Sequence, residues 1–253
     1  MIRSSDITAI ILAGQRPGID PLAAAFDLEC KALIPVGGIP MVSRVFAALD
    51  AHPAITSIRV MAQDVAALKR AGDFEVSPSG ATIAATIAPL VAEAREPMLI
   101  TTADHALLSA AMLDSFITKA RGADLAIGMV ERHTLLAAYP QSKRTWLKFR
   151  GGAYSGANLF WVGSPDVMPL LDIWKQVEQK RKRGRALIGA FGPWILLGVA
   201  LRLLTLEGAL AKIGKRFGIT IVPVILPQAE ACIDVDSIAD HQLVERIIAV
   251  RSA

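Results

Sequence analysis

Residues 7–41 read ITAIILAGQRPGIDPLAAAFDLECKALIPVGGIPM, a stretch that begins with the first predicted strand and continues into a glycine-containing loop. The run from Ile7 to Ala13 has the aliphatic character of a strand covered on both faces, as in parallel sheets. Gly14 ends the run, and a glycine there lets the backbone approach a ligand while free N–H groups hold phosphate oxygens. A loop then leads to Lys31, for which a phosphate is one partner and bulk solvent the alternative. Taken alone, the stretch fits a phosphate site and a plain turn equally well.

The rest of the chain alternates strand-length apolar runs with segments of helical period. This alternation predicts an α/β protein in which helices cover both faces of a mostly parallel central sheet, a Rossmann-like three-layer αβα sandwich. In such sheets ligands bind beyond the carboxyl ends of the strands, so polar residues that follow a strand are the candidates for function. The predicted strands cover residues 7–13, 57–62, 97–101, 125–130, 145–149, 157–162 and 219–226. The predicted helices cover residues 40–51, 81–94, 110–121, 165–182 and 238–250.

Length and composition narrow the class of protein. We treat residues 1–253 as a single α/β domain with a helical insert at about 165–216. The formal net charge of +4 fits an anionic small substrate, a membrane surface or nucleic acid. Aromatic residues make up only 6%, which disfavours stacking on single-stranded nucleic acid, so no nucleic-acid partner is expected. Cys30 and Cys232 lie far apart in sequence and suit a reducing cytoplasm, and the first apolar run is too short for a signal peptide.

The insert has a basic first half and an apolar second half. Residues 175–185 read KQVEQKRKRGR, and residues 187–201 read LIGAFGPWILLGVAL without a charge. This run is too short to span a bilayer, which requires about 20 residues, and Gly192-Pro193 predicts a break between two short helices. Such a basic and apolar pair is typical of peripheral membrane contact, here through residues 175–206. A helical lid or a homodimer contact explains the pair at least as well.

Three aspartates stand where a metal ion could bind. Asp104 directly follows a predicted buried strand, and a carboxylate in that position suits Mg²⁺, which takes one or two carboxylates together with phosphate oxygens. Capping of the next helix is the alternative role, but that helix is expected to begin near Ser109. Asp234 and Asp236 alternate on a short extended piece, so only one of them can face Asp104. The other, or Ser237, is expected to cap the last helix.

Small residues surround Asn158 in the segment GGAYSGANLFWV. Gly156 and its neighbours leave room beside the backbone, and the Asn158 amide both donates and accepts hydrogen bonds. A binding-site floor and a tight β-hairpin explain this segment equally well. His105, beside Asp104, is expected to be structural rather than a catalytic base.

Four motifs together resemble those of nucleotidyltransferases with the GT-A-like fold, in particular the molybdenum-cofactor guanylyltransferase-like group. They are ILAGQRPG after the first strand, KALIPVGGIPM before the first long helix, TTADHALL after the middle strand and IDVDSIAD before the last helix. They occur in the family's order over nearly the whole chain. Gln15 stands where the family usually has a further glycine, and Ser237-Ile238-Ala239 stands where it usually has Thr-Pro-Glu.

The resemblance implies how the nucleotide is held. The loop after the first strand would lie against the nucleotide, with Arg16 on the phosphates. Lys31 would neutralise the triphosphate or the acceptor phosphate, so Arg16 and Lys31 are the implied catalytic residues. The implied nucleotide-binding residues are Leu12, Ala13, Gly14, Gln15, Arg16, Ser79, Gly80, Thr102 and Asp104.

The resemblance also implies a metal site and an acceptor site. Asp104 and Asp234 would hold Mg²⁺ or Mn²⁺, with Asp236 as the alternative to Asp234. Gly156 and Asn158 would contact the acceptor.

The implied activity is transfer of a nucleoside monophosphate from a nucleoside triphosphate to a phosphorylated acceptor, with release of pyrophosphate. The acceptor would be a sugar, polyol or lipid-linked phosphate. A glycosyltransferase of the same fold is one alternative, but such enzymes usually carry a DxD motif where TADH has a single aspartate. A non-catalytic nucleotide-binding protein at a membrane surface is another, and the presence of both Asp104 and Asp234 argues against it.

Overall fold

The computed structural model describes residues 6–14, 18, 20–179 and 193–252. The predictions for Gln15 and Arg16, for residues 180–185 of the basic run and for the first half of the apolar run lie outside the described residues. Within the described ranges, no helix is both long enough and apolar enough to cross a membrane.

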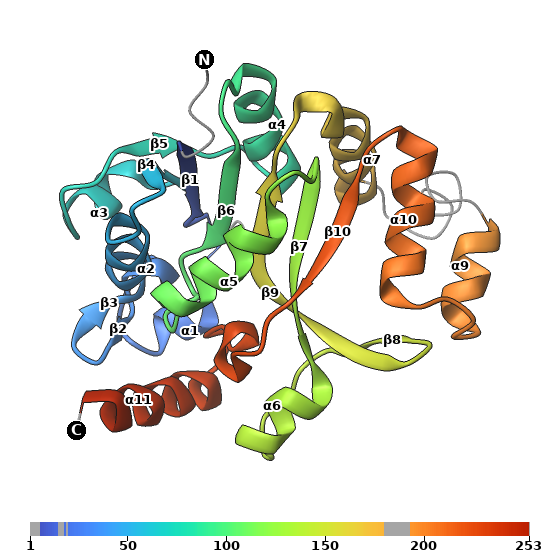
Figure 1. Cartoon of the computed structure of the whole chain (residues 1–253). Coiled ribbons are helices and arrows are strands. Elements are labelled where there is room, and N and C mark those ends of the chain that lie inside the picture. The colour runs from blue at the N-terminus through green and yellow to red at the C-terminus, as the bar shows by residue number, and fades with distance from the viewer. Residues whose placement is uncertain (1–5, 15–17, 19, 180–192, 253) are drawn as a thin grey trace.

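The centre of the molecule is an eight-stranded sheet among the described residues, with the order β10-β7-β9-β6-β1-β4-β5 and β8 paired to β9 (Figure 1). β1 pairs in parallel with β4 and β6, and β4–β5 and β7–β10 are also parallel. The prediction of a mostly parallel central sheet is therefore confirmed. The strands are β1 (Ile7–Leu12), β4 (Ile55–Ala62), β5 (Val76–Pro78), β6 (Met98–Thr102), β7 (Leu125–Glu131), β8 (Leu147–Phe149), β9 (Gly152–Val162) and β10 (Ile221–Ile225).

One strand in the middle of the sheet runs against its neighbours. β9 is antiparallel to β6, β7 and β8. Its predicted range covered only residues 157–162, whereas the strand begins at Gly152. The missing half is rich in glycine and polar residues, which weaken the apolar signal of a strand. A separate two-stranded ribbon of β2 (Pro35–Val36) and β3 (Ile39–Pro40) forms the VGG turn.

Helices cover both faces of the sheet, which confirms the three-layer architecture. Alternate side chains of β1 enter different cores: Ile7 and Ile11 join one hydrophobic cluster, and Ile10 joins the other. The first cluster contains buried residues of α2, α5 and α11, and the second contains those of α4 and α7. The helices are α1 (Pro21–Ala24), α2 (Met41–Asp50), α3 (Val65–Lys69), α4 (Ile83–Glu93), α5 (Ala110–Ala120), α6 (Arg132–Ala138), α7 (Met168–Gln179), α9 (Pro193–Ala200), α10 (Leu206–Phe217) and α11 (Ile238–Ser252). Three short 3₁₀ turns are η1 (Lys31–Leu33), η2 (Pro165–Val167) and η3 (Ala229–Cys232).

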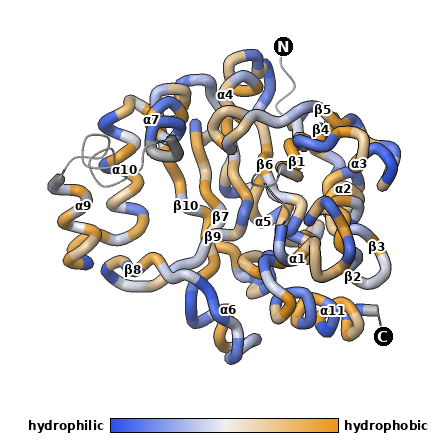
Figure 2. The backbone as a smooth tube through the Cα atoms, turned by 180° about the vertical axis from the view of Figure 1, so that it is seen from behind, coloured by the Kyte–Doolittle hydropathy of each residue, from blue (hydrophilic) through white to orange (hydrophobic). Residues whose placement is uncertain are grey.

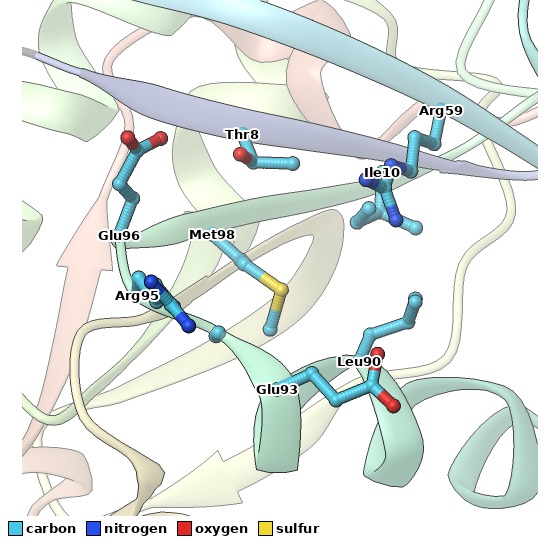
Figure 3. A pocket seen from close by; sticks show the side chains of 9 residues that line it. Thr8, Ile10, Arg59, Leu90, Glu93, Arg95, Glu96 and Met98 are labelled. Atoms are coloured by element: carbon cyan, nitrogen blue, oxygen red, sulfur yellow. The ribbon is translucent and has the colours of Figure 1, made fainter.

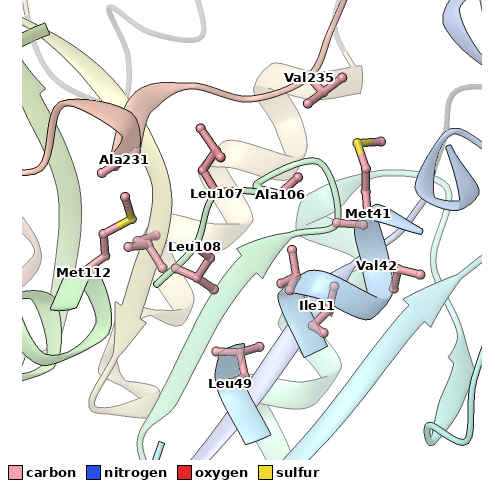
Figure 4. Packing of buried hydrophobic residues seen from close by; sticks show 14 of the residues in the cluster. Ile11, Met41, Val42, Leu49, Ala106, Leu107, Leu108, Met112, Ala231 and Val235 are labelled. Atoms are coloured by element: carbon pink, nitrogen blue, oxygen red, sulfur yellow. The ribbon is translucent and has the colours of Figure 1, made fainter. Parts of the chain in front are cut away.

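The larger core lies directly beneath the loops that follow β1 and β6. Ile11, Met41 and Leu107 are almost completely buried in it, and Figure 4 shows them with their neighbours. Burial of an aliphatic side chain of this size contributes about 1.5–3 kcal/mol to folding. Because the side chains beneath these loops are tightly packed, the core holds the loops in position.

Local capping sets several helix boundaries. The Ser109 hydroxyl accepts a hydrogen bond from the Met112 amide, which confirms that α5 begins just after Ser109. The helix predicted at residues 81–94 begins at Ile83, two residues later than predicted, because the Thr82 hydroxyl caps it by accepting a hydrogen bond from the Ala85 amide. α9 begins at Pro193. The second of the two short helices was predicted to begin there, after the break at Gly192-Pro193.

Candidate active site

The carboxyl ends of β1 and β6 meet at one edge of the sheet. Leu12 pairs with Thr102 in the parallel register, and the Ala103 amide donates to the Leu12 carbonyl at 3.0 Å. The chain continues from these ends into Gly14 and Asp104. A small hollow at this edge is lined by Leu12, Ala13, Gly14, Lys31, Ala32, Met41, Ala103 and Asp104.

Lys31 connects two of the predicted metal ligands. Its Nζ lies 2.8 Å from Oδ2 of Asp104 and 2.5 Å from Oδ1 of Asp236. Asp104 also accepts a hydrogen bond from the Thr102 hydroxyl. Burial lowers the pKa of Lys31, but the charge of Asp104 and hydrogen bonds to both carboxylates outweigh burial, so the pKa is raised above its ordinary value. Lys31 is therefore a fixed positive charge at the point where the two carboxylates converge.

The backbone around Lys31 fixes this position. Lys31 opens the 3₁₀ turn η1, and the neighbouring Ala32 and Ile34 are buried in the core. The Ile34 amide donates to the Lys31 carbonyl at 3.1 Å, which closes the turn. The lysine side chain is thereby directed towards Asp104 from a loop whose apolar residues anchor it.

Asp234 lies in a second, adjoining network. Oδ1 of Asp234 is 2.5 Å from an Arg144 nitrogen, and Oδ2 accepts a hydrogen bond from Nδ2 of Asn158 at 3.3 Å. Arg144 also reaches Asp240 at 2.8 Å, so one guanidinium holds both aspartates. Burial and then the charge of Asp236 raise the pKa of Asp234 to about 6, although Arg144 acts in the opposite direction.

The side chains of residues 233–236 (IDVD) alternate between two sides, as expected of an extended segment. Asp234 faces Arg144 and Asn158, whereas Asp236 faces Lys31. Val235 between them is fully buried, and its amide donates to the Asp104 carbonyl at 3.1 Å. This bond ties the piece to the end of β6.

The cap of α11 is provided by Ser237. Its hydroxyl accepts a hydrogen bond from the Asp240 amide at 3.2 Å and donates to the Asp240 carboxylate at 2.6 Å. The sequence left this cap to one of the two aspartates or to Ser237, and the structure shows that Ser237 provides it.

Asn158 is aimed at Asp234 by an irregularity in β9. The pairing of β7 with β9 shifts register between Ile127 and Met129, and Asn158 has a φ of 48°. Asparagine tolerates this left-handed conformation better than most residues. The opposing Gly128 has little room, because an added Cβ would lie 3.1 Å from Cβ of Leu159. The bulge turns the amide of Asn158 towards the site.

Gly156 lies two residues before Asn158 in the same strand. It is exposed, and a Cβ added to it would have no heavy atom within 4 Å. The space beside it is open, so an acceptor could approach the strand there.

Ser79 and Gly80 follow β5 at the same edge of the sheet as Gly14. The Ser79 amide donates to the Ala62 carbonyl, and the Gly80 amide donates to the Thr86 hydroxyl at 3.0 Å. A Cβ at Gly80 would lie 2.9 Å from the carbonyl carbon of Ala85, so close packing against α4 accounts for this glycine. The Ser79 hydroxyl is buried and has no hydrogen-bond partner in the part of the chain that the structure describes.

Two residues of the site, Arg144 and Asp240, were not predicted from the sequence. Arg144 lies between α6 and β8, and its side chain is only 9% exposed. Asp240 lies in the first turn of α11. Neither stands at the end of a strand, so only the tertiary contact with Asp234 reveals them.

His105 is a structural residue. It is 1% exposed, its Nδ1 lies 3.4 Å from the Thr101 hydroxyl, and burial lowers its pKa to about 4. An uncharged imidazole in the core fits the expectation that it is not a catalytic base.

The donor set at this edge suits a hard divalent cation. Carboxylate oxygens of Asp104 and of Asp234 or Asp236 are ligands that Mg²⁺ and Mn²⁺ accept. Among the described residues, no three His, Cys, Asp or Glu side chains are grouped closely enough to form a metal site by themselves. A site completed by phosphate oxygens of a nucleotide fits this arrangement.

A second hollow, of about 240 Å³, lies at the other end of the same strands (Figure 3). Thr8 and Met98 at the starts of β1 and β6 line it, together with charged side chains such as Arg59 and Glu93. Because ligands of open parallel sheets bind beyond the carboxyl ends of the strands, this hollow is not the candidate active site.

A mostly parallel sheet carries a glycine turn, a lysine and carboxylates at its carboxyl edge, where ligands of α/β proteins bind. The chain belongs to the MobA-like NTP transferase domain family, whose model matches residues 9–185. Comparison with curated protein sequences gave no significant match.

Several solved structures have a similar fold. A hypothetical transferase from Thermus thermophilus has 27% sequence identity and a TM-score of 0.79, over 93% of this chain and 99% of that one. A CMP:2-keto-3-deoxy-manno-octonic acid synthetase in complex with CTP has 12% identity and a TM-score of 0.60, over 97% and 99%. A 2-C-methyl-D-erythritol 4-phosphate cytidylyltransferase, also from Thermus thermophilus, has 12% identity and a TM-score of 0.54, over 96% and 99%. At 12% identity the likeness is one of fold.

Proposed function

We propose that the protein is a nucleotidyltransferase that transfers a nucleoside monophosphate from a nucleoside triphosphate to a phosphorylated acceptor. The observation that carries this proposal is the ion pair between Lys31 and Asp104, 2.8 Å long, in the hollow beside Gly14. A fixed cation and a metal-binding carboxylate at this edge suit a triphosphate and its divalent ion. Membership of the NTP transferase family supports the same reaction.

The reaction needs little covalent chemistry from the protein. An oxygen of the acceptor phosphate attacks the α-phosphorus, a P–O bond forms, and the bond to the β-phosphate oxygen breaks to release pyrophosphate. The acceptor phosphate is already ionised at neutral pH, so no strong general base is required. The chain aligns the two reactants and neutralises their charge, with Lys31 directed at the phosphates.

The proposed metal ligands are Asp104 and Asp234, with Asp236 as the alternative to Asp234. When bound there, Mg²⁺ or Mn²⁺ would neutralise phosphate charge and help to align the phosphates. Asp234 is favoured because it is partly buried near two other carboxylates, whose repulsion a divalent cation relieves. Arg144 and Asn158 then act as positioning residues that orient Asp234.

The remaining proposed roles are those that the resemblance of the motifs implies. The nucleotide would lie along Leu12, Ala13 and Gly14, with Gln15 and Arg16 continuing that loop. The base and ribose would lie near Ser79 and Gly80, with Thr102 beside the metal ligand. The acceptor, a sugar, polyol or lipid-linked phosphate, would contact Gly156 and Asn158. A cytoplasmic location and a homodimer contact stay predictions.

Pyrophosphate release tests the proposal. Purified protein with Mg²⁺ is incubated with each nucleoside triphosphate and a panel of phosphorylated sugars, polyols and lipids, and a parallel arm contains sugar nucleotides with the same acceptors. We expect pyrophosphate only with a triphosphate and an acceptor together, and a loss of release in Asp104→Ala. Consumption of a sugar nucleotide instead would identify a glycosyltransferase.

A further inference from the structure

The helix α9 exposes an apolar face that the rest of the described chain does not cover. Trp194 is 81% exposed, Leu197 48% and Leu201 60%. Leu201 lies in the turn just after α9, and its amide still donates to the Leu197 carbonyl at 2.9 Å. The spacing of three and four residues therefore places all three side chains on one side of the helix axis. Figure 2 shows α9 as a largely hydrophobic segment at the outer margin of the molecule. An exposed tryptophan beside exposed leucines is a typical mark of an interaction surface.

The position of α9 is fixed by backbone contacts on its other side. Leu203 and Leu204 both donate amide hydrogen bonds to the Gly198 carbonyl, at 2.8 and 3.3 Å. A Cβ on Gly198 would lie 3.0 Å from the Leu204 side chain, so the glycine permits this close turn. The Arg150 amide, at the tip of the β8–β9 hairpin, donates to the Leu204 carbonyl at 2.9 Å. The apolar face is therefore held in place by the hairpin and by the turn after α9.

Basic side chains border this face. Arg202 is exposed in the turn after α9, next to Leu201, and Lys148 and Arg150 are exposed on the adjoining hairpin. The segments 147–151 and 193–205 contain the three basic residues Lys148, Arg150 and Arg202 and no acidic residue. A partner that covers the face therefore has to be apolar at its centre and anionic at its border.

We propose that α9 and the β8–β9 tip dock on an anionic lipid bilayer. Trp194, Leu197 and Leu201 enter the boundary between headgroups and acyl chains, and the basic residues contact the anionic headgroups. A second copy of the chain fits less well, because a two-fold contact places the same basic border against itself. The inference is independent of the proposed reaction, since none of these residues belongs to the candidate active site.

Vesicle flotation of the full-length protein tests the docking. The probes are vesicles of phosphatidylcholine alone and of phosphatidylcholine with phosphatidylglycerol, each at low and high salt. We expect the wild type to float with the anionic vesicles at low salt only. Trp194→Ser combined with Leu201→Ser is expected to lower vesicle binding about tenfold or more, and Arg150→Glu with Arg202→Glu about fivefold per charge.

Matched variants separate docking from misfolding. Val250→Ser removes an equally exposed apolar side chain from α11, and Lys69→Glu reverses an exposed charge on α3, at the opposite end of the molecule (Figure 1). Both are expected to float as the wild type does. Trp194→Phe keeps the apolar face, so it should float normally but lose the blue shift of tryptophan fluorescence on vesicles.

Two results would overturn the proposal. One is a wild type that stays unbound to anionic vesicles at low salt. The other is vesicle binding that the Trp194→Ser and Leu201→Ser variant retains while the same variant loses a concentration-dependent dimer, which would assign the face to a second copy.

Discussion

Nζ of Lys31 lies 2.8 Å from Oδ2 of Asp104, although 73 residues separate the two in the chain. The contact joins the loop after β1 to the end of β6 at the carboxyl edge of the sheet. Because Asp236 reaches the same ammonium group, the lysine holds three distant segments together. The proposed reaction therefore depends on charges that the fold, rather than local sequence, brings together.

Replacement of Lys31 by Met should reduce both stability and activity. The substitution leaves Asp104 and Asp236 facing one another without the cation between them, and we expect a loss of about 2 kcal/mol in the free energy of unfolding. Chemical denaturation measures this loss. The exposed Lys69→Met on α3 is the control and should unfold as the wild type does. Asp104→Asn in the Lys31→Met background should recover part of the loss, and additive losses would contradict the ion pair's role.

Removal of the Arg144 guanidinium should destabilise the protein more strongly. Arg144→Met leaves Asp234 and Asp240 as partly buried carboxylates without their shared partner, at a cost of about 3 kcal/mol. Arg121→Met, at an exposed arginine after α5, is the matched control. An Arg144→Met protein as stable as the control would show that this network is not structural.

Stability should depend on pH through His105. The folded state keeps the imidazole neutral down to about pH 4, whereas the unfolded chain takes up a proton near pH 6.5. The unfolded state therefore binds more protons in this window, and the free energy of unfolding should fall as pH falls from 6.5 to 4, by up to about 3 kcal/mol. His105→Leu should remove this contribution, and the exposed His133→Leu should retain it. Equal pH slopes in His105→Leu and wild type would contradict the assignment.

The raised pKa of Asp234 should change the free energy of unfolding in the opposite direction, over an overlapping pH range. Its pKa is raised to about 6, so the folded state binds more protons than the unfolded chain between about pH 4 and pH 6. Its contribution to stability is then present at low pH and lost as pH rises. Asp234→Asn should gain stability relative to wild type from about pH 4 to pH 6. Thermal unfolding of both proteins across that range measures the difference, and a relative loss would contradict the raised pKa.

The Mg²⁺ dependence of two variants can show whether Asp234 or Asp236 binds the metal together with Asp104. Asp234→Asn should raise the Mg²⁺ concentration for half-maximal activity by about tenfold or more. Asp236→Asn should change it less, because Asp236 is 61% exposed and contacts Lys31. Binding of Mn²⁺ with a non-hydrolysable triphosphate gives the same comparison without turnover. The reverse order would assign the metal to Asp236.

Much of the fold could be predicted because long strands and helices carry clear periodicity. β1, β4, β6 and β7 lie close to their predicted ranges. Most elements that escaped prediction are short: β5 has three residues, α3 has five and α6 has seven, too few to display a clear period. The longer α10 (12 residues) was predicted only as part of the helical insert at about 165–216. The reversed direction of β9 also escaped, because apolar pattern says nothing about strand direction.

The positions of Gly14 and Asp104 could be predicted because both residues closely follow a buried strand, whereas Lys31 comes from the loop after Gly14. Gly14, Lys31 and Asp104 line one hollow, and the alternation of Asp234 and Asp236 holds. Arg144 could not be predicted, since a lone arginine in a loop has no pattern. The left-handed backbone of Asn158 depends on the register shift against β7, which is a property of the assembled sheet.

Nucleotidyl transfer can be followed directly through the α-phosphate of the nucleoside triphosphate. Protein, Mg²⁺, α-labelled nucleoside triphosphate and the acceptor that released pyrophosphate are incubated, and the label is traced. We predict that the label appears in a nucleotidyl-acceptor product, that Asp104→Asn lowers this transfer about 100-fold or more, and that Asp172→Asn on α7 leaves it unchanged. Label found only in free nucleoside monophosphate, or transfer that survives Asp104→Asn, would contradict the account.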